Sequence, residues 1–273
     1  MSIRKRLGRR MMKMFRSASG QKFLDRWAGR LDIWRGYGAG AYVNDSGEAI
    51  LFELLARDKT RRERVIIFDV GANVGDFTAA ALKAMGPRAT IHAFEPARQT
   101  FARFSNRFVG TGQVIAHNVA LGRTNEERAL FGVGRDIGMA SLIQRRLSNG
   151  ESSEFQETVN VRSLNEYCAS AAIDRIDLLK IDVEGFELEV LMGAKALFDE
   201  GKIDLCSFEF GGCNLDSRTY LRDFFEFFHK YDMRIFRITP AGTIVELSRY
   251  HEQLERFTTT NYVARRRLPP ARP

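Results

Sequence analysis

Cysteine is scarce in this chain, which has 273 residues and only three cysteines. They are Cys168, Cys206 and Cys213, and no two of them form a C-x-x-C pair. An odd number of widely spaced cysteines gives no disulfide framework. Apolar or small residues adjoin each of them, so we expect buried, reduced thiols. This cysteine usage favours a reducing compartment, and we predict a cytoplasmic location.

Long apolar runs are also missing. No stretch reaches the ~18 consecutive apolar residues that a transmembrane helix needs. No apolar segment follows the basic N-terminus, because Lys13 and Arg16 interrupt the bulky residues between Met11 and Phe15. The sequence therefore predicts neither a membrane-spanning helix nor a secretory signal.

Net charge is nearly absent from most of the chain, although the whole carries a formal charge of +8. Residues 1–35 contain eleven Lys and Arg but only two Asp, a net charge of +9, which leaves about −1 for the remainder. The high isoelectric point therefore belongs to an N-terminal arm. A nearly neutral body offers no basic groove, so nucleic acid is not expected as a partner.

The arm itself has the pattern of an amphipathic helix. Bulky residues such as Leu7, Phe15 and Trp27 recur at helical spacing, and basic residues fill the other positions. Ser17 and Gly20 are the positions at which this helix would break in two. Such a helix is suited to peripheral association with an anionic membrane surface. A solvated tail and a helix packed against the body are the alternatives.

From residue 65 onward, predicted strands and helices alternate regularly. Five repeats of this alternation are typical of a mainly parallel sheet with helices on both faces. The turn at residues 239–242 indicates a C-terminal antiparallel hairpin. We therefore predict a Rossmann-like α/β domain over residues 65–265, with a helical lead-in at 36–64 and a basic, proline-rich tail at 266–273.

The expected elements follow from this pattern. Strands are predicted at 65–70, 90–95, 113–121, 176–182, 203–209, 233–238, 243–247 and 261–264. Helices are predicted at 48–57, from the 71–75 turn to about 85, from Pro96 onward, at 164–171, 186–198 and 216–231. Residues 123–162 are interpreted as an inserted loop with short strands at 128–133 and 157–161.

Small and polar residues stand at the ends of the predicted parallel strands. In such a sheet, ligands bind outside the carboxyl ends of the strands, where the strand order reverses. We therefore expect these residues to converge on one crevice. They are Asp69, Gly71, Asn73 and Gly75 at the first strand, Glu95 and Pro96 at the second, Asn118 and Ala120 at the third, Asp182, Glu184 and Gly185 at the fourth, and Glu209 at the fifth.

The turn between Gly71 and Gly75 indicates a nucleoside cofactor. Glycine allows a ligand to approach the backbone closely, and the start of the following helix presents N–H groups to an anion. Glu95, twenty residues past Gly75, is placed to accept from both ribose hydroxyls. The G-x-G-x-x-G fingerprint of dinucleotide sites is absent. Asp69 can accept from an ammonium group and the turn amides can receive a carboxylate, which suits the amino-acid end of S-adenosylmethionine.

Five segments carry a more specific pattern. They are Asp69-Val-Gly-Ala-Asn-Val-Gly75, Phe94-Glu-Pro96, Gly138-Met-Ala-Ser-Leu142, Leu179-Lys-Ile-Asp-Val-Glu-Gly-Phe-Glu187 and Phe208-Glu209. Together they closely resemble the FkbM family of class I methyltransferases over roughly residues 65 to 265. The resemblance implies S-adenosylmethionine as methyl donor. It also implies O-methylation of a hydroxyl, often on a sugar of a glycan, glycolipid or natural product.

The resemblance implies roles for single residues as well. Asp69, Gly71, Ala72, Asn73, Val74 and Gly75 match the loop at the methionine end, Glu95 beside Pro96 matches the ribose carboxylate, and Asn118, Ala120 and Ser141 match the adenine side. Asp182 and Glu184 then face the methyl-transfer centre.

Methyl transfer to a hydroxyl needs an acceptor in line with the C–S bond and a base within hydrogen-bond reach. Asp182 is the first candidate for the base, and Glu184 and Glu209 are the next. Three carboxylates near one point would alternatively hold a divalent cation that acidifies the hydroxyl. Glu184 and Glu187 would otherwise cap the helix that follows, because acidic groups are favourable at a helix start.

Other classes of protein stay open from the sequence. An NAD(P)-dependent oxidoreductase needs a pyrophosphate loop and a catalytic Tyr–Lys pair or His, which this pattern does not supply. The remaining alternatives are an N-methyltransferase, an RNA methyltransferase and a non-catalytic module that binds membrane or RNA. His92 and His117 lie inside predicted strands and are expected to be core or sheet-face residues, and none of the four histidines is assigned a catalytic role.

Overall fold

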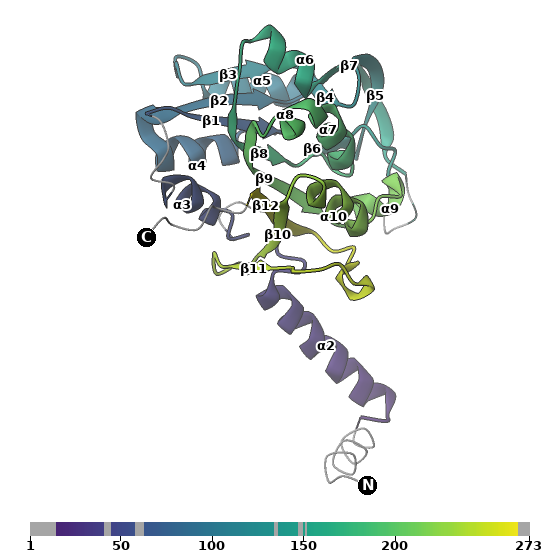
Figure 1. The fold of residues 1–273 in the computed structure, drawn as a ribbon. Helices are drawn as coiled ribbons and strands as arrows, with labels where there is room; N and C mark the ends of the chain where they lie inside the picture. Colours follow the sequence, from purple (N-terminus) through teal and green to yellow (C-terminus); the bar gives the residue numbers. More distant parts are fainter. Residues whose placement is uncertain are drawn as a thin grey trace, which may run out of the picture.

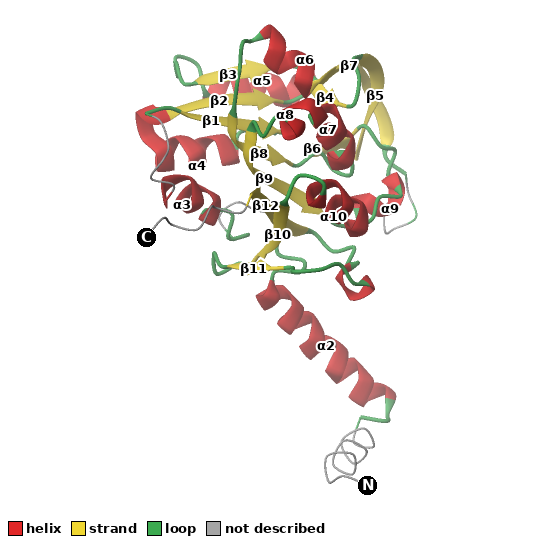
Figure 2. Cartoon of the chain, in the orientation of Figure 1, coloured by secondary structure: helices red, strands yellow, loops and turns green. Residues whose placement is uncertain are grey.

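The computed structural model describes residues 15–40, 45–57, 63–133, 136–146, 150 and 152–266. A large sheet forms the centre of the body, with helices on both of its faces (Figure 1). A smaller sheet lies to one side, and the helix α2 (Ala18–Arg35) extends away from the body (Figure 2).

The large sheet has eight strands in the order β11-β10-β12-β9-β8-β1-β2-β3. Its strands β1, β2, β3, β8 and β9 pair in parallel, whereas β10, β11 and β12 pair antiparallel. This confirms the predicted parallel sheet with a C-terminal hairpin, and β12 inserts between the hairpin and β9. Their bounds are β1 Val65–Val70, β2 Ala89–Phe94, β3 Val114–His117, β8 Ile176–Ile181, β9 Ile203–Phe210, β10 Met233–Ile238, β11 Ile244–Glu246 and β12 Thr260–Arg266.

Alternate residues of the central strand β1 enter different apolar clusters, because successive side chains point to opposite faces of a sheet. Ile67 joins Phe52 and Phe77 on one face, and Phe68 joins Phe198 and Phe228 on the other. The helices around the sheet are α3 Ile50–Arg57, α4 Asp76–Met85, α5 Arg98–Arg107, α6 Leu164–Ser170, α7 Glu187–Gly193, α8 Lys195–Asp199, α9 Cys213–Ser217 and α10 Leu221–His229. Helices therefore cover both faces, as predicted.

The smaller sheet is the main departure from the sequence-based expectation. It has four strands in the order β4-β7-β5-β6 and occupies the segment that was expected to be an inserted loop with two short strands. The apolar run 113–121 predicts one strand, but the chain leaves the large sheet at Asn118 and continues as a strand of the smaller one. The bounds of this second sheet are β4 Ala120–Gly122, β5 Glu126–Val133, β6 Asp136–Ser141 and β7 Glu154–Ser163.

Two long predicted helices are each broken. The segment 186–198 forms α7 and α8, which meet at Ala194. The segment 216–231 forms α9 and α10, because Arg218 has a left-handed backbone and Tyr220 with Asp223 makes a capping box that starts α10. Pro96 lies just before α5 and does not open it, since α5 begins at Arg98.

Part of the predicted arm forms α2. Ser17 is its N-cap and accepts a hydrogen bond from the Gly20 amide at 3.0 Å, so α2 begins directly after Ser17, and Gly20, the other predicted break point, lies inside the helix. The first fourteen positions of the arm lie outside the described residues. Among the helices that are described, none combines the length and the apolar character that crossing a bilayer requires.

Candidate functional site

A cavity of about 780 Å³ lies at the carboxyl ends of the parallel strands. Its wall is formed by residues that follow β1, β2, β8 and β9, on either side of the point where strand order reverses between β1 and β8. Most of the predicted site residues meet here. Those that line it are Gly71, Asn73, Glu95, Pro96, Ala120, Ser141, Asp182, Glu184 and Glu209. Asp69, Ala72, Val74, Gly75 and Asn118 lie outside the lining.

The Gly71 turn joins β1 tightly to the loop after β8. Gly71 has a φ of +81°, and a Cβ atom there would lie 1.8 Å from the backbone oxygen of Asp182. The amides of Gly71 and Ala72 donate to the Phe94 carbonyl, and the Gly75 amide donates to the Ala72 carbonyl. These three amides are therefore already hydrogen-bonded within the protein, and the contact of the turn with a cofactor carboxylate stays a prediction.

Glu95 is buried at the end of β2, and its side chain faces the cavity. One carboxylate oxygen accepts from the Asn73 amide and the other from the Ala97 amide, both at 2.9 Å. An ionised carboxylate has about four lone-pair positions, so about two stay open for hydroxyl groups. Burial raises the pKa of Glu95 to about 7. These features fit the predicted ribose contact.

Asn118 acts on this loop from behind. Its side-chain amide donates to the carbonyls of Glu95 and Pro96, at 2.9 and 2.8 Å. Asn118 therefore holds the end of β2 in place and is not part of the cavity wall, in contrast to the predicted contact with adenine.

Asp69 belongs to a buried ionic network beneath the cavity. Its carboxylate is fully buried, accepts from the Thr78 hydroxyl at 2.7 Å and lies 3.6 Å from Lys180 Nζ. Burial raises the pKa of Asp69, while Lys180 and the Thr78 hydroxyl oppose that rise. The prediction that Asp69 binds an ammonium group of the cofactor is therefore wrong, because Lys180 already fills that role.

Lys180 links this network to the cavity. Its Nζ atom lies 3.1 Å from a carboxylate oxygen of Asp182, which lines the cavity. Burial disfavours the charge of Lys180, but Asp182, Asp69 and Glu48 outweigh it and raise the lysine pKa. Glu48, which precedes α3, is itself buried, and burial raises its pKa to about 7. A lysine inside an apolar strand was the available sequence signal for this network, whereas Glu48 had none.

The acidic end of the cavity consists of Asp182, Glu184 and Glu209. Glu184 has a left-handed backbone, with a φ of +56°. Its Oε2 atom lies 2.7 Å from Arg145 Nη1 and accepts from the Cys213 thiol at 2.8 Å. Burial raises the pKa of Glu184, and Asp182 adds to that rise. Two protein groups therefore already hold the Glu184 carboxylate.

Glu209 differs from its neighbours. Within the part of the chain that the structure describes, its carboxylate has no hydrogen bond or ion pair, although the residue is only 9% exposed. Burial raises its pKa well above the usual range, and the nearby charges of Asp182 and Glu184 add to the effect. Glu209 is therefore a buried, unpaired carboxylate in the cavity wall.

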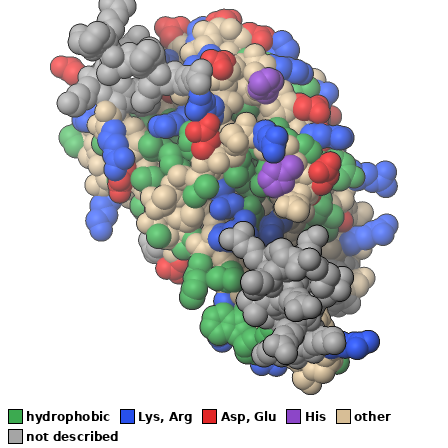
Figure 3. Space-filling model, turned by 60° about the horizontal axis from the view of Figure 1, so that its bottom comes forward, with side chains coloured by type: hydrophobic (Ala, Val, Ile, Leu, Met, Phe, Trp, Pro, Cys, Tyr) green, Lys and Arg blue, Asp and Glu red, His purple; other side chains and the backbone are tan. Residues whose placement is uncertain are grey.

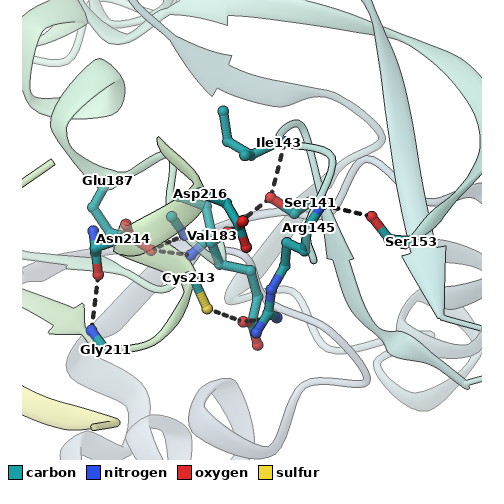
Figure 4. Close-up of polar contacts among 12 residues, drawn as sticks. Ser141, Ile143, Arg145, Ser153, Val183, Glu187, Gly211, Cys213, Asn214 and Asp216 are labelled. Atoms are coloured by element: carbon teal, nitrogen blue, oxygen red, sulfur yellow. Dashed lines mark hydrogen bonds and ion pairs between the residues drawn. The ribbon is translucent and has the colours of Figure 1, made fainter. Parts of the chain in front are cut away.

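Glu187 does not cap α7 in the predicted way, because its side chain bonds to the loop that precedes the helix. One of its carboxylate oxygens accepts from the amides of Val183 and Gly185, at 3.2 and 2.9 Å (Figure 4). Glu187 thus stabilises the loop that carries Asp182 and Glu184 at the start of α7. The side chain of Glu184 does not cap α7 either.

The cavity also contains residues that sequence reasoning missed. Part of its apolar wall comes from the second sheet and from the loop after β6, and Arg145 comes from that same loop. These residues are Leu130, Ala140, Leu142 and Arg145, together with Gly38, Cys213, Phe257, Thr258 and Thr259 from other segments. The first group was missed because the short strands expected within residues 123–162 were not expected to form a second sheet beside the cavity.

The strand histidines have the structural role that was predicted. The Tyr167 hydroxyl lies 2.7 Å from His92 Nδ1 and 2.8 Å from His117 Nε2. Burial lowers the pKa of His92 to about 4. This chain of contacts lies outside the lining of the main cavity and supports the sheet.

A mainly parallel sheet with this strand order, helices on both faces and a cavity at the switch point define the class I methyltransferase fold. The chain belongs to the methyltransferase FkbM domain family, whose family model matches residues 69–235. This confirms the resemblance seen in the sequence motifs.

Named relatives agree with this assignment. Methyltransferase 1 of Beauveria bassiana is 33% identical over 160 residues, covering 51% of this chain and 64% of that protein. The hexuronic acid methyltransferase AglP of Haloferax volcanii is 29% identical, covering 59% of this chain and 60% of that protein. The 2-O-methyltransferase NoeI of Sinorhizobium fredii is 26% identical, covering 48% and 57%. The chain thus spans less than two thirds of the length of these relatives.

Among solved structures, the methyltransferase FkbM of Methylobacillus flagellatus is similar to this chain with a TM-score of 0.46 and 18% identity. The similarity covers 78% of this chain and 47% of that one.

Proposed function

We propose that this protein is an S-adenosylmethionine-dependent O-methyltransferase whose acceptor is a hydroxyl group of a sugar. The observation that carries the proposal is a single cavity with Glu95 at the end of β2 and the unpaired Glu209 at the end of β9. Glu95 suits the binding of a nucleoside, and Glu209 suits the removal of a proton from the acceptor hydroxyl. Membership of a methyltransferase family supports the combination.

The cofactor would lie between the ends of β1 and β2 and the second sheet. Glu95 would accept from the ribose hydroxyls, and apolar residues such as Pro96, Ala120 and Leu142 offer a surface for adenine. When bound, S-adenosylmethionine supplies a methyl group on a positively charged sulfur. The Gly71 turn contributes space and a fixed position for Glu95, since its amides bond within the protein.

Glu209 is our preferred general base. Asp182 lies beside Lys180, and Glu184 lies beside Arg145, so each of these carboxylates already has a cationic partner. Glu209 has no such partner among the described residues, and burial raises its pKa, so its ionised form is a stronger base than an ordinary carboxylate. The hydroxyl proton of the acceptor would move to the Glu209 carboxylate as the oxygen takes the methyl group. Asp182, the first candidate from the sequence, would then orient the acceptor.

A sugar acceptor agrees with the chemistry of this end of the cavity. Carboxylates accept hydrogen bonds, so Asp182 and Glu209 suit a ligand with several hydroxyl donors. The names of AglP and NoeI refer to a hexuronic acid methyltransferase and a 2-O-methyltransferase, which supports the same class. Clustered carboxylates would repel RNA phosphates, and this argues against an RNA acceptor.

A divalent cation is the alternative occupant of the acidic end. Glu184, Glu209 and Cys213 each offer a ligand atom, and these atoms lie within 4.8 Å of one another. Arg145 already balances Glu184, which favours the base over the cation. Loss of activity in EDTA, with recovery on adding Mg²⁺ or Mn²⁺, would assign these residues to a metal instead.

Methyl transfer from labelled S-adenosylmethionine to a panel of methyl glycosides, both uronic and neutral, tests the proposal. Glu209→Gln should lower kcat by ~10²-fold or more, the usual scale for a general base, with cofactor Kd changed only a few-fold. Asp182→Asn should lower kcat by a smaller factor than Glu209→Gln does. The reverse order of the two variants would make Asp182 the base. An enzyme that binds the cofactor but methylates no glycoside would refute the sugar acceptor.

A further inference from the structure

The helix α2 is unusual because it exposes large apolar side chains. None of its residues is buried, although it is eighteen residues long. Trp34 is 68% exposed, and Phe23, Trp27 and Leu31 are between 43% and 51% exposed. Figure 3, which turns this end of the molecule forward, shows hydrophobic side chains on the surface with Lys and Arg side chains close to them. Such an apolar surface normally marks a site of interaction.

Five of the six exposed large apolar residues of α2 lie on one side of the helix, and Ile33 lies apart from them, on the side of Lys22 and Arg26. At ~100° per residue, Phe23, Trp27 and Trp34 fall within a narrow sector that Leu24 and Leu31 extend to about 100°. This apolar sector is therefore defined by Phe23, Leu24, Trp27, Leu31 and Trp34.

Basic residues of α2 border the apolar sector, and its acidic residues lie on the opposite side. Lys22, Arg26 and Arg30 lie along one border, and Arg35 lies at the other. Both acidic residues of the helix, Asp25 and Asp32, lie opposite the sector. A helix with apolar residues between basic borders fits the interface of an anionic membrane. Tryptophan is itself enriched at that depth.

The C-terminal end of α2 is fixed to the body. Arg237 donates from Nε to the Arg35 carbonyl at 2.8 Å, and its guanidinium lies 4.4 Å from the centre of the Tyr37 ring. Arg256 lies against the other side of this contact, 4.5 Å from the Tyr37 ring, and pairs with Asp32. The orientation of α2 is therefore set by the body at this end.

The same attachment lies at the edge of the cavity. The Gly38 amide donates to the Thr259 carbonyl at 2.9 Å, and both residues line the cavity. Only Gly36 and Tyr37 separate the end of α2 from Gly38. A surface that holds α2 would thus lie near the cavity.

We propose that α2 binds in the interface of an anionic phospholipid membrane through its apolar sector. The basic borders would contact lipid phosphates while the aromatic side chains enter the acyl boundary. A second copy of the chain is a poorer occupant, because pairing two such helices brings basic borders together. It follows, and this part rests on the proposed function, that the acceptor sugar is attached to a lipid.

The two tryptophans of the chain are Trp27 and Trp34, so tryptophan fluorescence, excited selectively over tyrosine, reports on α2 alone. Adding phosphatidylcholine–phosphatidylserine vesicles to the full chain should shift the emission to the blue at low salt, and high salt should reverse the shift. Pure phosphatidylcholine vesicles should cause little change. No shift with the anionic vesicles would overturn the proposal. A blue shift that rises with protein concentration without lipid would assign the apolar sector to self-association.

Sedimentation with the same vesicles provides the matched comparison. The double variant Trp27→Ser/Trp34→Ser keeps the charge and should partition ~10-fold or more weakly. The control Val109→Ser/Phe155→Ser removes exposed apolar residues from the body, where these side chains are 77% and 59% exposed, and should pellet like the parent. Equal binding by the tryptophan variant would contradict the proposal. Cofactor affinity is measured separately. A loss of vesicle binding with normal cofactor affinity contradicts this inference alone, whereas a chain that binds no cofactor contradicts the proposed function.

Discussion

Glu95 is a buried carboxylate whose side chain nevertheless faces the cavity. Burial raises its pKa, so a substantial fraction is protonated near neutral pH. Two backbone amides nevertheless hold its oxygens in a position that suits an anion. A ligand that donates two hydroxyls to the ionised form would lower its pKa and release a proton on binding.

This predicts a pH-dependent cofactor affinity. Because the carboxyl pKa in the free protein is about 7, binding should weaken as pH falls below 7, by up to ~10-fold per unit, and level off above it. Calorimetric titrations between about pH 5.5 and 8 give the profile. Glu95→Gln should bind more weakly and with a flat profile. The control Glu53→Gln, at an exposed carboxylate of α3, should keep the parent profile. An unchanged slope in Glu95→Gln would assign the pH dependence elsewhere.

Single residues also mark where sequence reasoning succeeds. Gly71, Glu95 and Asp182 follow buried apolar strands, and the position after a parallel strand places a side chain at the switch-point edge. Asp69 fails the same reasoning because its side chain points into the core, where Lys180 pairs with it. The position of a residue relative to a strand does not by itself predict whether its side chain faces the ligand.

At the scale of elements, the turn between β1 and α4 depends on its close contact with the loop after β8. Gly71→Ala combines a left-handed backbone with a Cβ atom placed against the Asp182 carbonyl. We expect it to lower the free energy of unfolding by about 3 kcal/mol or more and to weaken cofactor binding. Gly110→Ala is the matched control, with a φ of +77° and open space around its Cβ, and should cost about 1 kcal/mol. Urea denaturation compares them, and equal losses would contradict the steric account.

The second sheet shows why some elements could not be predicted from the sequence. The segment before Gly122 has the composition of one strand, and only the hydrogen bonds of Asn118 to the end of β2 mark where it leaves the first sheet. β5 and β7 pair across a long separation in sequence, so neither has a local hairpin signal. The predicted short strands at 128–133 and 157–161 did fall within these two strands.

At the scale of the whole molecule, Lys180 joins the lead-in, β1 and β8 through one buried charge. Its neighbours Asp69, Asp182 and Glu48 all contribute to its raised pKa. Asp69 and Glu48 themselves have raised pKa values, caused first by burial. The network therefore depends on its single cation.

Lys180→Met should remove about 3–5 kcal/mol from the free energy of unfolding, because it leaves buried carboxylates without a partner. A carboxylate whose folded-state pKa is raised stabilises the fold more at low pH and loses that contribution as pH rises through the pKa. The deficit should therefore be larger at pH 8 than at pH 5. Urea unfolding at both values measures it. Lys195→Met, at an exposed ion pair of α8, should stay within about 0.5 kcal/mol of the parent. A deficit independent of pH would contradict the network.

The central claim is that this cavity is a binding site for S-adenosylmethionine built around Glu95. Isothermal titration calorimetry of the purified full chain tests it most directly, with S-adenosylmethionine and NAD as ligands and with Glu95→Ala beside the parent. The account predicts saturable binding of S-adenosylmethionine, none of NAD, and a loss of affinity of ~10-fold or more in Glu95→Ala. Unchanged affinity in Glu95→Ala, or binding of NAD in place of S-adenosylmethionine, would contradict it.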